Sequence, residues 1–271
     1  MTDALSTGGY TVAALYKFAR FADPAALRQP LLDLCTERNI CGSLLLAGEG
    51  INGTVAGSDE GIAELVAFIR TLPGCSDLEV KYSHAAEKPF GRMKVKLKRE
   101  IVTMGICDID PAIHAGTYVE PEHWNALISD PDVLLIDTRN DYEVAIGTFE
   151  GAVNPEIGTF RAFPEWFTAE METRKPRRVA MFCTGGIRCE KSTAFARAQG
   201  FDEVYHLKGG ILRYLEQVPA DKSMWNGQCY VFDERISVGH GLVQGNMTAC
   251  KACGAPYPND SAHNCPKGVA A

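Results

Sequence analysis

The sequence predicts an α/β protein made of two domains and a short cysteine-rich tail. Three observations support this prediction. The 271 residues are enough for about two domains. Two blocks of the chain each alternate between strand-like and helix-like segments. Four of the ten cysteines lie beyond residue 220. We expect the first domain at residues 1–110, the second at residues 120–220 and the tail at residues 221–271.

The first block has the element order of a small sandwich of helices on one sheet. Asp23 and Ser58 are typical N-cap residues, and Pro24 suits the first helical position after Asp23. Gly48-Glu49-Gly50 predicts a hairpin turn. The expected strands are residues 11–18, 42–47, 51–56, 78–83 and 93–97, and the expected helices are residues 24–38 and 59–72. The order β-α-β-β-α-β, followed by one extra strand, predicts a ferredoxin-like domain.

A basic segment ends the first block. Residues 88–99 contain six basic residues and no acidic residue, although the net charge of the chain is −7. Alternation along a strand places Lys94, Lys96 and Lys98 on one face and Val95 and Leu97 on the other. That basic face is either an ordinary solvated surface or a phosphate-binding site. We call its candidate residues the basic stripe: Arg92, Lys94, Lys96, Lys98 and Arg99.

The second block predicts a central parallel sheet. Residues 101–119 form a connector with Pro111 and two glycines. Residues 133–136 and 179–182 are continuous apolar runs, as expected of strands buried on both faces. Residues 189–199 are expected to form a helix that ends before Gly200, and a further strand and helix are expected at residues 204–207 and 211–217.

The apolar run at residues 179–182 leads directly into Cys183, which we expect at the carboxyl edge of the sheet. Small residues follow, whose N–H groups can form an anion-binding nest beside the N-terminus of the next helix. Arg188 adds a fixed positive charge. These features favour a thiolate or persulfide, so we expect a low pKa for Cys183 and a reactive sulfur. The predicted cysteine loop consists of Cys183, Thr184, Gly185, Gly186, Ile187 and Arg188.

Cys189 follows the loop immediately. It is either an accessory thiol, which resolves or accepts sulfur from Cys183, or a small residue on a helix face. Glu190 and Lys191 are expected to be solvated charges in the first helical turn.

This arrangement resembles the rhodanese domain over roughly residues 120–220. Asp137-Thr138-Arg139, with Glu143, is similar to its early signature, and Leu207-Lys208-Gly209-Gly210-Ile211 is similar to its closing motif. Residues 147–154 are similar to a further family stretch, although Thr148 and Phe149 replace the usual His-Ile. Phosphatases of this fold have five residues between the cysteine and the arginine. This chain has four, which favours a smaller, sulfur-centred anion.

The resemblance extends over nearly the whole chain to the rhodanese-related tRNA uridine hydroxylase family. It is carried by residues 48–54 (Gly-Glu-Gly-Ile-Asn-Gly-Thr), by residues 90–105, which contain the basic stripe, and by residues 227–235. The resemblance implies hydroxylation of the wobble uridine of tRNA to 5-hydroxyuridine, with dioxygen as co-substrate, Cys183 as the catalytic residue and the anticodon arm as the partner.

The tail contains a candidate zinc site. Cys250-x-x-Cys253 and His263-x-Cys265 supply four ligands of the type that zinc prefers. Structural zinc and a reduced tail without metal are both consistent with this spacing. The sequence shows no signature of an organic cofactor.

Composition restricts the remaining choices. No apolar run approaches the length of a membrane helix, and no export signal is seen, so we expect a cytoplasmic protein with reduced thiols and no membrane partner. Two other functions stay open. One is a sulfurtransferase that moves sulfane sulfur through a Cys183 persulfide, and the other is a non-enzymatic tRNA- or protein-binding module.

Overall fold

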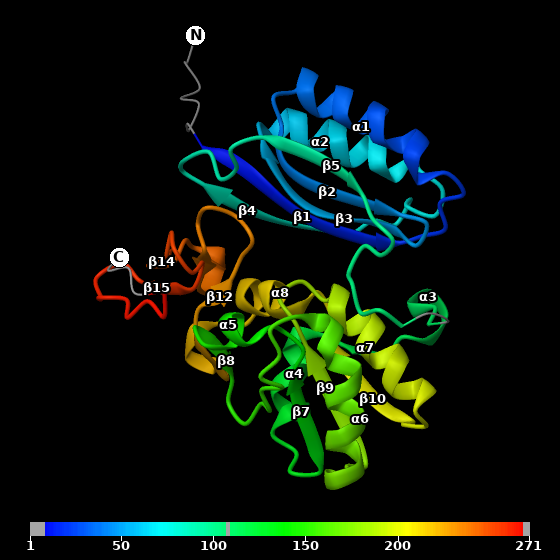
Figure 1. Ribbon diagram of the computed structural model, residues 1–271, viewed down its shortest axis with the longest axis vertical. Coiled ribbons are helices and arrows are strands. Elements are labelled where there is room, and N and C mark those ends of the chain that lie inside the picture. Colours follow the sequence, from blue (N-terminus) through cyan, green and yellow to red (C-terminus); the bar gives the residue numbers. More distant parts are fainter. Residues whose placement is uncertain (1–8, 107–108, 268–271) are drawn as a thin grey trace. The chain divides into compact units, whose positions relative to one another are not determined.

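The protein divides into two compact units in the computed structural model, which describes residues 9–106 and 109–267 (Figure 1). Unit 1 ends at Ile101 and unit 2 begins at Val102. The expected boundary lay near residue 110. No helix among the described residues is long and apolar enough to cross a membrane.

Unit 1 is a five-stranded sheet with two helices on one face (Figure 1). The sheet order is β4-β1-β3-β2-β5, and only the β2–β5 pair is parallel. The order of β4, β1, β3 and β2 confirms the predicted ferredoxin-like arrangement, with β5 as the extra strand at the edge. The strands are β1 (Tyr10–Phe18), β2 (Cys41–Ala47), β3 (Gly50–Gly57), β4 (Val80–Ala85) and β5 (Met93–Leu97).

The helices of unit 1 begin where their caps predict. Asp23 accepts hydrogen bonds from the N–H groups of the first turn of α1 (Pro24–Glu37). Ser58 accepts one from Gly61 in α2 (Asp59–Arg70). Each such cap contributes about 1 kcal/mol to helix stability. The apolar sides of both helices pack on the sheet, where Leu31, Leu44 and Leu65 are fully buried in the core.

Unit 2 contains a four-stranded parallel sheet with the order β6-β10-β9-β7. The strands are β6 (Thr117–Val119), β7 (Val133–Asp137), β9 (Arg178–Phe182) and β10 (Glu203–Leu207). The last two predicted helices are present as α7 (Ile187–Ala198) and α8 (Gly210–Gln217). Strand β6 and helix α3 (Pro111–His114) lie within the expected connector, and β6 is too short to show a period-2 pattern.

Both faces of this sheet are covered, which explains the uninterrupted apolar runs of β7 and β9. On one face, α6 (Phe163–Arg174) and α7 pack over Val179 and Met181. On the other face lie α4 (Pro121–Ile128) and α8. Aromatic rings fill this second face, with ring centroids 4.7 to 6.4 Å apart: Trp124, Phe149, Phe182, Tyr214 and Trp225.

The tail is built into unit 2. Strand β11 (Trp225–Gly227) pairs with β8 (Gly147–Phe149), which lies far from it in sequence. Two small hairpins follow, one from β12 (Cys229–Tyr230) and β13 (Ser237–Val238), and one from β14 (Met247–Ala249) and β15 (Pro256–Pro258). The short helix α5 (Asp141–Val144) and three single-turn helices, Phe160–Ala162, Ala220–Lys222 and His240–Leu242, complete the described elements of unit 2.

Candidate active site

The cysteine loop lies between strand β9 and helix α7, so Cys183 stands at the carboxyl edge of the parallel sheet as predicted. The Gly186 N–H donates a hydrogen bond to Cys183 Sγ at 3.1 Å. Gly186 has φ of 101°, a left-handed conformation that favours glycine and turns this N–H toward the sulfur. The sequence pattern and the geometry therefore agree on an anion-binding turn.

The closing glycine motif holds the backbone of this loop. The N–H groups of Ile211 and Leu212, in the first turn of α8, donate to the carbonyl oxygens of Cys183 and Thr184, each at 3.0 Å. A Cβ on Gly210 would lie 2.5 Å from the Cys183 carbonyl oxygen. Only glycine allows this close approach, so the two motifs form one rigid backbone assembly.

Arg188 does not stand free beside the sulfur, because it forms a buried ion pair with Glu143. Its Nη1 and Nη2 atoms donate to the two carboxylate oxygens at 2.6 and 2.7 Å. Thr184 also donates to this carboxylate, at 3.2 Å. Burial alone would raise the pKa of Glu143, but the charge and hydrogen bonds of Arg188 hold it below its usual value. Glu143 thus ties the cysteine loop to helix α5.

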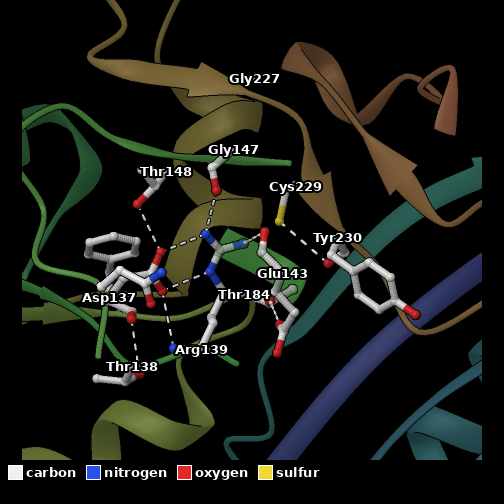
Figure 2. A network of polar contacts seen from close by, with 12 residues as sticks. Asp137, Thr138, Arg139, Glu143, Gly147, Thr148, Thr184, Gly227, Cys229 and Tyr230 are labelled. Carbon is white, nitrogen blue, oxygen red and sulfur yellow. Dashed lines mark hydrogen bonds and ion pairs between the residues drawn. The ribbon is translucent and has the colours of Figure 1, made fainter. Parts of the chain in front are cut away.

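A second buried ion pair joins Asp137 and Arg139, and Glu143 lies beside it (Figure 2). Arg139 donates to both carboxylate oxygens of Asp137, at 2.9 and 2.6 Å, and to the carbonyl oxygens of Glu143 and Gly147. Thr148 donates to Asp137 at 2.9 Å, so the residue that departs from the usual His still serves the network. The early signature therefore acts as a frame that fixes Glu143.

The Cys183 thiol is acidified. Burial raises its pKa, but a hydrogen bond from Cys189, the Arg188 charge and nearby backbone N–H groups outweigh burial and lower the pKa to about 6. The surroundings of Cys183 therefore favour its thiolate form. The expectation of a low pKa followed from the loop and Arg188. The contribution of Cys189 was not foreseen.

Cys189 lies in the first turn of α7 with its thiol against Cys183. Thr138 Oγ1 is 3.7 Å from Cys189 Sγ and donates to the Phe182 carbonyl oxygen at 3.0 Å. Burial and the neighbouring Cys183 sulfur raise the pKa of Cys189 well above its usual value. The two shifts have opposite directions, so Cys183 is the more acidic sulfur of the pair. The role of Thr138 beside Cys189 carried no sequence signal beyond its place in the early signature.

Two charged residues beside Cys183 are more buried than the sequence predicts. Cys183 is fully buried. Glu190 and Lys191, expected to be solvated, are 5% and 3% exposed. The expectation was wrong because the connector covers this turn. Tyr118 donates to Glu190 at 2.7 Å, and Lys191 donates to the Val102 carbonyl oxygen at 3.0 Å.

The basic stripe lies on and beside β5 in unit 1. All five of its side chains are exposed, and none forms an ion pair with another residue that the structure describes. Val95 is buried in the core, but Leu97 is 45% exposed because β5 is an edge strand and its end is uncovered. The stripe thus keeps its full positive charge at the surface.

Cys250, Cys253, His263 and Cys265 meet in the tail, with their ligand atoms all within 4.8 Å of one another. The Cys250 and Cys265 sulfurs are 3.7 Å apart, and Cys253 Sγ is 3.1 Å from His263 Nε2. Two sulfurs bound tetrahedrally to one zinc ion lie about 3.8 Å apart. Backbone N–H groups of Cys253 and Ala252 lower the pKa of Cys250 to about 7. These donors fit a tetrahedral metal ion.

Comparison with known proteins identifies the family. Residues 10–101 match a family described as UPF0176 acylphosphatase like domain, and residues 120–217 match the Rhodanese-like domain. A tRNA uridine(34) hydroxylase of Gluconobacter oxydans is 64% identical over 250 residues, which cover 90% of this chain and 80% of that protein. One of Brucella suis is 60% identical over 252 residues, covering 93% and 83%. This chain belongs to the tRNA uridine(34) hydroxylase family. The family resemblance expected from the motifs is confirmed.

Proposed function

We propose that this member of the tRNA uridine(34) hydroxylase family hydroxylates the wobble uridine of tRNA to 5-hydroxyuridine, with dioxygen as co-substrate. The observation that carries the proposal is the close relationship to proteins of that name over most of their length. The acidified Cys183 supports it, because the family's rhodanese-type loop is intact and holds a thiolate.

Cys183 is the proposed catalytic residue. Its sulfur, as a thiolate or as an oxygenated or persulfidic derivative, would touch the reacting uridine. The cysteine loop, Thr184 to Arg188, would stabilise negative charge there through its backbone N–H groups and the positive charge of Arg188, which is ion-paired with Glu143. Cys183 is fully buried, so the uracil ring reaches it only when the surrounding surface opens.

The basic stripe is the proposed tRNA contact. Its cations are exposed and form no ion pair with a described residue, which suits the phosphates of the anticodon arm. These phosphates would supply affinity without reading sequence. Single-stranded bases of the loop would then be available for unstacking toward Cys183. A protein of net charge −7 needs such a local patch to hold a polyanion.

The tail cluster is proposed to hold structural zinc, with Cys250, Cys253, His263 and Cys265 as ligands. The separations and chemistry of the four donors support this assignment. A bound ion would fix the β14–β15 hairpin against the end of the described chain. We assign it no part in the reaction.

Nucleoside analysis of tRNA tests the proposed function. A strain that lacks this protein should lose 5-hydroxyuridine and the wobble modifications derived from it, and the wild-type gene should restore them. A sulfurtransferase would instead leave 5-hydroxyuridine unchanged and turn over a small sulfane-sulfur donor. Unchanged 5-hydroxyuridine in the deletion strain, with no second enzyme acting at that position, would refute the proposal.

A further inference from the structure

The Cys183 and Cys189 side chains lie next to each other where β9 ends and α7 begins. Both side chains are fully buried and both are reduced. Gly186 connects them, since its N–H donates to Cys183 Sγ and its carbonyl oxygen accepts from the Cys189 N–H, and the Cys189 thiol lies close enough to stabilise the Cys183 anion. A third polar group, the Thr138 hydroxyl, lies 3.7 Å from Cys189 Sγ. This geometry is more than a cysteine loop requires, since the nest at Gly186 already holds the Cys183 sulfur.

The two sulfurs differ in the way that disulfide chemistry needs. The thiolate is the reactive form, so Cys183 meets an oxidant first, while Cys189 stays protonated until its neighbour is oxidised. The Cys189 N–H donates to the Gly186 carbonyl oxygen at 3.0 Å, which fixes Cys189 on the turn that carries Cys183. A disulfide between them therefore closes within one loop and one helical turn.

Hydroxylation by dioxygen has an electron requirement that a dithiol meets. Inserting one oxygen atom into the uracil C5–H bond leaves the other atom to be reduced to water. That reduction takes two electrons and two protons. The Cys183 thiolate and the Cys189 thiol release both electrons and one proton when they become a disulfide, and solvent supplies the other proton.

We propose that Cys183 and Cys189 form a dithiol–disulfide couple that supplies the two electrons for uridine hydroxylation. This inference rests on the function proposed above. The C5–H and O–O bonds and the Cys189 S–H bond break, and a C5–OH bond, water and the Cys183–Cys189 S–S bond form. Cys189 and solvent each supply one proton of the water. Carbon C5 and the two sulfurs are oxidised, and dioxygen is reduced. A small thiol reductant must then restore the dithiol for the next turnover, by exchange through a mixed disulfide.

A single-turnover experiment tests the couple. The full-length protein is reduced, freed of reductant without oxygen, and mixed with unmodified tRNA and dioxygen. We expect on the order of one 5-hydroxyuridine per protein, by the stoichiometry above, with loss of two thiols and a Cys183–Cys189 disulfide in peptide mass spectra. Adding a thiol reductant should then restore repeated turnover.

Variants separate this role from a structural one. Cys189→Ser should lose most of the single-turnover product and regain turnover in proportion to added thiol, which then replaces Cys189. Cys35→Ala, which removes a buried thiol from unit 1, should behave as wild type. The thiol count of the wild-type protein stays informative even where Cys189→Ser folds poorly.

The outcomes distinguish the two proposals. If wild-type protein forms 5-hydroxyuridine and retains all its thiols, the dithiol–disulfide proposal is refuted and the hydroxylase proposal is not. Cys189→Ser with a wild-type single turnover would do the same. No product from wild-type protein at any thiol concentration would refute the hydroxylase proposal, and the couple with it.

Discussion

Arg188 and Glu143 face each other in a bidentate ion pair, with N–O distances of 2.6 and 2.7 Å, in a region where Glu143 is completely buried. The pair joins the helix after the cysteine loop to the short helix α5. A capping box determines the place of Glu143, since its carboxylate also accepts the Asn140 N–H at 3.1 Å. Both the buried charge of Arg188 and the position of the cysteine loop thus depend on the Glu143 carboxylate.

Glu143→Ala should destabilise unit 2 by about 3–5 kcal/mol, because it leaves the Arg188 charge buried without a partner. Urea unfolding followed by tryptophan fluorescence measures this, since all three tryptophans lie in unit 2. The control is Glu170→Ala, which breaks a partly exposed pair with Arg174 and should cost less than about 1 kcal/mol. Equal effects of the two changes would contradict the structure.

The same pair makes unit 2 sensitive to acid. The folded-state pKa of Glu143 is lower than its unfolded value of about 4.3. Its contribution to stability is therefore complete above that value and is lost as the pH falls through the folded pKa. Glu143→Gln should flatten the dependence of the unfolding free energy on pH in this acid range.

The Cys183 thiolate should be visible in a titration. The ultraviolet absorbance of thiolate, taken as the difference between wild type and Cys183→Ser, should rise with a midpoint near pH 6. Cys189→Ala should move this midpoint upward, because it removes a hydrogen bond that stabilises the anion. A midpoint near the usual cysteine value of about 8.5 would contradict the described loop.

Neutralising the basic stripe should weaken tRNA binding regardless of sequence. Converting Lys94, Lys96 and Lys98 to Ala should lower the log–log salt slope by up to roughly one unit per lost phosphate contact. The matched control converts three exposed lysines of unit 2, Lys175, Lys222 and Lys251, and should leave the slope unchanged. If the triple variant binds tRNA with wild-type affinity, the basic stripe is an ordinary solvated face and not a tRNA contact.

The purified protein should contain one metal ion bound in its tail. Metal analysis of protein never exposed to chelator should find about one zinc per chain, and Cys253→Ser should lower it. Chelation should loosen the β14–β15 hairpin, seen as faster amide exchange there, without affecting unit 1. Protein without zinc would remove the metal assignment.

Local signals in the sequence predicted most of the fold. The caps at Asp23 and Ser58, the apolar runs of β7 and β9, and the glycines around Cys183 each act within a few residues, and the structure contains the elements they predict. The family motifs then added a substrate that composition alone does not reveal.

Long-range packing accounts for what the sequence did not predict. Glu190 and Lys191 are charged residues whose burial depends on Tyr118 and on the Val102 carbonyl, both in a segment expected to be a plain connector. The contact of Cys189 with Cys183 depends on the pitch of the first helical turn of α7, and the β8–β11 pair joins residues some eighty positions apart, as no local period can show.

The most direct test of the central claim is Cys183→Ser in a deletion strain that depends on the plasmid-borne protein for 5-hydroxyuridine. We predict a protein that accumulates and unfolds like wild type, because serine replaces one buried sulfur, and tRNA without 5-hydroxyuridine in mass spectra of its nucleosides. Wild-type levels of 5-hydroxyuridine with the serine variant would contradict the assignment of Cys183 as the catalytic residue.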